Sequence, residues 1–118
     1  MKNLPVILTL FFVALTGTAL SAELPVWWKQ LSDEAQRDSY SLVTLDNLEN
    51  LYELKENFLI IDVRAGYEYN EGHLPGAVSF EFDLGDKLQL KPGKREAFLK
   101  LLGPDKNRKI IIYCRSFR

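Results

Sequence analysis

Hydrophobic residues along the chain form two kinds of pattern, unbroken runs and spacings that match one face of a helix. The unbroken runs span residues 58–63 and 109–113 and are rich in isoleucine. Such runs predict strands that are covered on both faces in a parallel sheet. Residues 77–82 predict a further strand, and residues 40–44 predict a short one.

Helical spacing separates these strands. Residues 32–37 predict a short capped helix, and residues 45–54 place leucines and a tyrosine on one face. Residues 65–71 predict a short helix closed by Gly72, and residues 92–102 predict a helix that starts near a proline. Strands that alternate with helices predict an α/β domain with a mainly parallel sheet, in which ligands collect at the carboxyl ends of strands.

The first 22 residues have the plan of a secretory signal peptide. A basic start precedes an apolar run over residues 4–15, and small residues follow. The run is about a dozen residues, short of the roughly 20 that cross a bilayer. We therefore expect cleavage after Ser21 or Ala22, a periplasmic or secreted protein, and no stable membrane insertion after cleavage. An uncleaved N-terminal anchor is the alternative.

Cleavage would leave an N-terminal arm over residues 23–39 and one domain over residues 40–118. The arm carries the adjacent residues Trp27 and Trp28. We expect them to cover the core, with an interaction patch as the alternative. The remaining length is enough for one small core and too short for two.

Composition narrows the classes of chemistry. One cysteine excludes a disulfide within the chain, and one cysteine with one histidine is too few for a structural zinc site. The net charge of −1 hides a split, because residues 23–86 carry 14 acidic and 4 basic side chains whereas residues 87–118 carry 2 acidic and 10 basic ones. No nucleic-acid recognition motif accompanies the basic residues, so we expect no nucleic-acid ligand. We expect no bound metal either.

Three motifs follow one another in the predicted domain. They are Ile61-Asp62-Val63-Arg64, then Gly72-His73-Leu74-Pro75-Gly76-Ala77 after Glu68, and finally Ile112-Tyr113-Cys114-Arg115-Ser116. In this order they resemble the rhodanese-like sulfurtransferase domain. The resemblance implies a mainly parallel sheet flanked by helices, and transfer of a sulfane sulfur from a small anionic donor such as thiosulfate to a thiol or cyanide acceptor.

Cys114 is the candidate nucleophile. A cysteine that follows a buried strand and enters a loop before a helix faces backbone N–H groups and a positive helix end, which favour the thiolate. The resemblance implies a persulfide on Cys114, a cradle of backbone amides over Arg115, Ser116, Phe117 and Arg118, and no metal or organic cofactor. The alternative is a small buried hydrophobic residue at the end of a core strand.

Asp62 and Arg64 end a neighbouring strand. We expect them to play a structural role by contacting the loop of Cys114 from the neighbouring strand end. The alternative for Arg64 is an ion pair with Glu68 one helical turn later. We expect His73 to fix the conformation of its turn, and a general base is the alternative role. Lys91, Lys94, Arg95 and Lys100 form a solvated helix face, or alternatively help to attract an anionic donor.

The chain also departs from the family pattern. Phe117 stands where the family commonly has glycine, and a phenylalanine ring would crowd a loop that curls around sulfur. The helix and the last strand that the family places after the loop are missing, so we expect a fragment or a frameshifted product. A non-catalytic sulfur-carrier or binding module is therefore an alternative function, and cysteine phosphatase chemistry is a third. Any protein partner and the oligomeric state stay open.

Overall fold

The centre of the fold is a parallel sheet of three strands. The structure, a computed structural model, describes residues 25–115, and within them the strand order is β2-β1-β3. The strands are β1 (Phe58–Asp62), β2 (Val78–Ser79) and β3 (Lys109–Tyr113). Both neighbours pair with β1 in parallel, and this central strand is buried from Leu59 to Asp62. The prediction of an α/β domain with a parallel sheet is confirmed.

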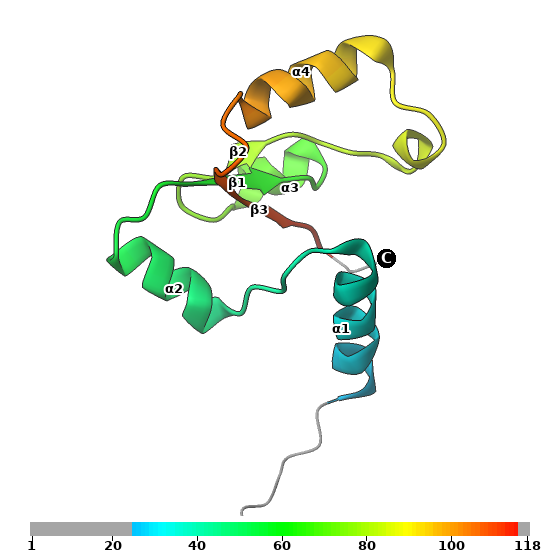
Figure 1. Ribbon diagram of the computed structural model, residues 1–118. Helices are drawn as coiled ribbons and strands as arrows, with labels where there is room; N and C mark the ends of the chain where they lie inside the picture. Colours follow the sequence, from blue (N-terminus) through cyan, green and yellow to red (C-terminus); the bar gives the residue numbers. More distant parts are fainter. Residues whose placement is uncertain (1–24, 116–118) are drawn as a thin grey trace, which may run out of the picture.

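Helices cover the sheet on two sides, as Figure 1 shows. On one side lies α2 (Leu45–Glu53), which begins with a capping box between Thr44 and Asn47. Its Leu48 packs with buried residues of the sheet layer, and the cluster comprises Leu48, Ile60, Ala77 and Ile111. Burial of each large apolar side chain in such a cluster contributes about 1.5–3 kcal/mol.

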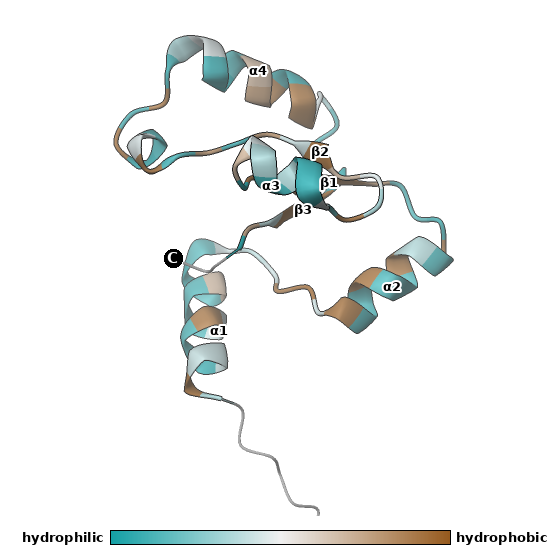
Figure 2. Cartoon of the chain, turned by 180° about the vertical axis from the view of Figure 1, so that it is seen from behind, coloured by the Kyte–Doolittle hydropathy of each residue, from teal (hydrophilic) through white to brown (hydrophobic). Residues whose placement is uncertain are grey.

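On the other side lies α4 (Pro92–Leu102), which is hydrophilic over its first turns and hydrophobic toward its end (Figure 2). Phe98 anchors it, because this ring lies 5.1 Å from Phe80 and 5.2 Å from Phe82, measured between ring centroids. The helix ends at Gly103, whose φ of 77° is a conformation that glycine adopts at little cost.

Three further helical segments complete the described chain. The first helix, α1 (Val26–Asp38), is twice as long as the predicted segment over 32–37 and includes both tryptophans. Trp27 is exposed and Trp28 half-buried, whereas Leu31 and Ala35 are the buried residues of this helix. The helix predicted before Gly72 is α3 (Gly66–Glu71). An unpredicted 3₁₀ turn, η1 (Leu84–Lys87), is held by the side chain of Asp83.

Two strand predictions need correction. Residues 40–44 form no strand, because they pair with no strand of the sheet. An open hollow of about 660 Å³ is lined by residues 40–43 and by residues 109–111 of β3. The strand predicted over 77–82 is confined to Val78–Ser79. Beyond Ser79, the Phe80 N–H donates to the Asp62 carbonyl at 2.8 Å and the Phe82 N–H donates to the Val63 carbonyl at 3.1 Å.

The predicted signal peptide and its cleavage site lie outside the described residues. Within residues 25–115, no helix is long and apolar enough to cross a membrane.

A pair of isoleucines tests where the core sits. Ile61 and Ile112 are register partners on adjacent strands, yet Ile61 is 0% exposed and Ile112 is 55% exposed. Replacing Ile61 by alanine should lower the free energy of unfolding by about 3 kcal/mol, because it opens a cavity in the core. The same change at Ile112 should cost less than about 1 kcal/mol. Urea unfolding of both variants measures the difference, and equal losses would contradict this assignment of the core.

Candidate active site

The candidate site lies where β1 and β3 end side by side. Asp62 and Tyr113 are register partners at the carboxyl ends of these two parallel strands. The backbone N–H of Val63 continues the pairing by donating to the carbonyl oxygen of Tyr113 at 3.2 Å. Cys114 follows at once, so the pairing of the two strands fixes the peptide unit that enters the cysteine.

Asp62 is a charged group at the centre of this edge, and it is fully buried. Its carboxylate accepts hydrogen bonds from Nε and Nη2 of Arg64, at 2.7–3.1 Å, and from the backbone N–H of Arg64 at 3.0 Å. The Tyr113 hydroxyl donates a further bond of 2.6 Å. The Arg64 guanidinium, helped by Tyr113, outweighs burial and lowers the pKa of Asp62 to about 2. Asp62 is therefore an ion-pair anchor and no general acid at neutral pH.

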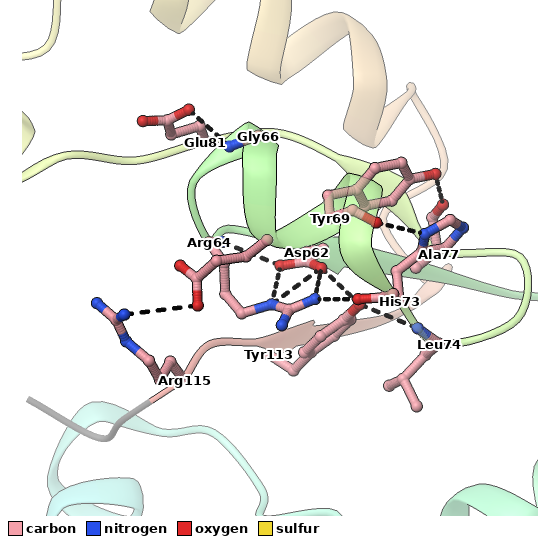
Figure 3. A network of polar contacts seen from close by, with 12 residues as sticks. Asp62, Arg64, Gly66, Tyr69, His73, Leu74, Ala77, Glu81, Tyr113 and Arg115 are labelled. Atoms are coloured by element: carbon pink, nitrogen blue, oxygen red, sulfur yellow. Dashed lines mark hydrogen bonds and ion pairs between the residues drawn. The ribbon is translucent and has the colours of Figure 1, made fainter.

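Arg64 and Tyr113 also reach the turn at residues 72–77, so that one network joins both strands to that turn (Figure 3). Arg64 Nη2 donates to the carbonyl of Gly72 at 2.7 Å. The backbone N–H of Leu74 donates to the Tyr113 hydroxyl at 3.1 Å. The Arg64 guanidinium also lies 5.4 Å from the centroid of the Tyr113 ring. Burial and the bond to the Asp62 carboxylate raise the pKa of Tyr113, so its hydroxyl stays protonated and remains a donor.

Aromatic side chains hold the rest of the turn. The hydroxyl of Tyr52 on α2 donates to the carbonyl of Pro75 at 2.6 Å, and that of Tyr69 on α3 donates to Ala77 at 2.9 Å. His73 stacks on the Tyr69 ring at a centroid distance of 3.7 Å, and its Nδ1 lies 2.9 Å from the Tyr69 carbonyl oxygen. His73 thus fixes the turn, as its position in the sequence predicts.

Cys114 itself is a free, exposed cysteine, which corrects the alternative of a buried hydrophobic residue. Next to it, Nη1 of Arg115 lies 3.6 Å from Oε1 of Glu68 on α3, with the Arg115 side chain 71% exposed. A pair this open and this long contributes little to stability. The guanidinium of Arg115 is therefore largely open to solvent. Ser116, Phe117 and Arg118 lie outside the described residues, so their predicted role in a cradle stays a prediction.

The structure thus brings Asp62, Arg64 and Cys114 to one edge, as predicted. Arg64 does not pair with Glu68, because the nearer carboxylate of Asp62 holds it in a bidentate bond. Glu68 pairs with Arg115 instead. Sequence reasoning missed Tyr113, whose hydroxyl joins the two strand ends. The available signal was its place directly before Cys114 on a predicted strand.

Among residues 25–115, no group of three or more histidine, cysteine, aspartate or glutamate side chains gathers that could hold a metal ion. Every buried side-chain nitrogen and oxygen in this part of the chain has a hydrogen-bond partner. The polar network around Asp62 is therefore complete with the chain's own groups.

Comparison with known proteins gives one match. The family model of the Rhodanese-like domain matches residues 44–118. No curated protein and no solved structure matches the chain.

Acid should weaken the fold through Asp62. Its folded pKa of about 2 lies below the ordinary value of 3.8, so the unfolded chain binds its proton first as the pH falls. The stabilisation is complete above about pH 5 and is lost toward pH 2. Asp62→Asn should cost about 3 kcal/mol at pH 7 because it leaves Arg64 without a buried counter-charge. That cost should shrink by about 2 kcal/mol toward pH 2.

Urea unfolding of wild type and variant across this pH range measures that cost. Asp33→Asn is the matched control, because Asp33 makes an exposed pair with Lys29, and its small effect should not change comparably. A cost of Asp62→Asn that is constant from pH 7 to pH 2 would contradict the assignment.

Proposed function

Since the chain belongs to the rhodanese-like domain family, whose members transfer or carry sulfur, we propose that it is a sulfurtransferase that works through Cys114. It takes a sulfane sulfur from a small anionic donor such as thiosulfate, holds it as a persulfide, and passes it to a thiol or cyanide. The proposal includes export to the periplasm or the exterior, which rests on the sequence of residues 1–22.

The observation that carries the proposal is the placement of Cys114. The thiol is exposed and follows a strand end that is tied to a buried ion pair. A nucleophile must be accessible to its substrate and held in one orientation. The exposed side chain meets the first need, and the hydrogen-bonded strand end meets the second.

The chemistry is a double displacement that needs no redox partner. The Cys114 thiolate attacks the outer sulfur of thiosulfate, a new S–S bond forms, and the S–S bond of the donor breaks to release sulfite. The electron pair of the broken bond leaves with sulfite. Cyanide then attacks the outer sulfur of the persulfide, which releases thiocyanate and restores the thiolate. Each step moves one sulfur atom with an electron pair going to the leaving group.

Arg115 supports the first step electrostatically. Its guanidinium is adjacent to Cys114 in the chain and is only loosely paired with Glu68. A dianionic donor can therefore compete for the same cation as it approaches the thiol.

Mass spectrometry tests the proposal directly. Treatment of the chain with thiosulfate should add one sulfur atom, about 32 Da, and the addition must lie on the chain's single cysteine. Added cyanide should remove the sulfur and yield thiocyanate. The variant Cys114→Ser should show neither change, because serine has no thiolate.

The outcomes separate the candidate functions. No mass gain on wild type would reject the sulfurtransferase function for this chain. A persulfide that cyanide does not discharge over repeated cycles would favour a sulfur-carrier module. Binding of a partner that survives Cys114→Ser would favour a non-catalytic binding module.

A second prediction concerns the donor's charge. Arg115→Gln should raise the thiosulfate concentration needed for half-maximal persulfide formation about fivefold, because one unit of positive charge beside the thiol is lost. Arg37→Gln is the matched control, because Arg37 is equally exposed at 70% and also pairs with one carboxylate, that of Asp38. The half-maximal concentration for this control should stay within twofold of wild type. Equal shifts in both variants would show that only the net charge matters.

A further inference from the structure

Tyr113 stands out among the residues that the sulfur-transfer chemistry does not itself use. It directly precedes Cys114, its ring packs against the core cluster, and its hydroxyl bonds to both Asp62 and the turn at residues 72–77. Sequence motifs assigned it no role.

We propose that Tyr113 is the positioning residue of Cys114, and that its hydroxyl fixes the end of β3 so that the thiol meets the sulfur donor in a productive orientation. This inference rests on the proposed sulfurtransferase function. Tyr113 does not touch the reacting atoms, and it acts through the backbone that enters Cys114.

The end of β3 has few contacts that hold it in place. Within the described residues this strand pairs on one side only, with β1. Ile110 and Ile112 are exposed, and only Ile111 of the strand is buried. The end of a short strand with one neighbour and little burial frays readily, and the cysteine sits at that end.

The Tyr113 hydroxyl ties this strand end to two neighbouring segments. It donates to Asp62 at 2.6 Å and accepts from the Leu74 N–H at 3.1 Å. Asp62 is immobile because Arg64 holds it at both oxygens. Tyr113 is therefore fastened to β1 and to the turn at once, and its carbonyl is held by Val63 at 3.2 Å. Three hydrogen bonds from two segments, residues 62–63 and the turn, thus fix the residue before the nucleophile.

The consequence is kinetic. Misplacement of a nucleophile by about 1 Å can cost up to a hundredfold in rate, whereas the intrinsic reactivity of a thiol toward a small neutral reagent needs no such alignment. Loss of the hydroxyl should therefore slow attack on thiosulfate more than it slows alkylation by iodoacetamide.

Tyr113→Phe removes the hydroxyl and keeps the ring in the core. Tyr52→Phe is the matched control, because the Tyr52 hydroxyl also bonds to the turn, at Pro75, but lies on α2 and not beside the cysteine. For the full chain and both variants, three quantities are measured. They are the maximal rate of persulfide formation, the half-saturating thiosulfate concentration, and the rate of iodoacetamide alkylation of Cys114.

For Tyr113→Phe we expect the maximal rate to fall about tenfold, while the half-saturating concentration and the alkylation rate stay within twofold of wild type. Tyr52→Phe should leave all three quantities within twofold. An unchanged maximal rate in Tyr113→Phe, or an equal fall in both variants, would overturn the positioning role and leave the sulfurtransferase function standing. A parallel fall in the rates of persulfide formation and alkylation would also overturn it, because thiol reactivity and not orientation would then have changed. A wild-type chain that forms no persulfide would reject the proposed function and this inference with it.

Discussion

The ion pair of Asp62 and Arg64 is the constraint on which the arrangement of the site depends. A carboxylate with no exposed surface is tolerated only when its oxygens are fully hydrogen-bonded, because burial of an unpaired charge costs several kcal/mol. Arg64 and Tyr113 supply those bonds from two different segments. Satisfying one buried charge therefore requires that the end of β1, the end of β3 and the turn at residues 72–77 lie together, since the same groups also bind that turn.

This constraint places the hydrogen-bonded network around Asp62 next to the exposed Cys114 in the chain. Cys114 is solvent-exposed at the end of a strand that has one neighbour among the described residues, which alone would give an accessible but poorly oriented thiol. The polar network supplies the orientation without covering the sulfur. Accessibility and alignment are thus provided by different parts of the structure, and a change in one need not alter the other.

The sequence predicted those features that depend on local pattern. The runs at residues 58–63 and 109–113 became adjacent parallel strands, and α4 begins and ends at its proline and glycine as predicted. The strand over 40–44 failed because a strand needs a hydrogen-bonded neighbour, and no local signal reports whether one is present. The bond from Tyr113 to Asp62 joins residues 51 positions apart, so spacing could not reveal it, whereas the bond from Arg64 to Asp62 spans two positions and lies within one motif.

The fold brings the acidic and the basic parts of the sequence into contact. Among the residues that the structure describes, three ion pairs join the acidic part of the chain, residues 23–86, to the basic part: Lys94 with Asp86, Lys109 with Glu56, and Arg115 with Glu68. The asymmetry is therefore partly neutralised within the molecule, which weakens it as an argument for a charged macromolecular partner. The first two pairs are close contacts, whereas Arg115 and Glu68 are 3.6 Å apart. The loosest of the three cations is thus that of Arg115, the residue that follows Cys114, and its ion pair costs the least to break.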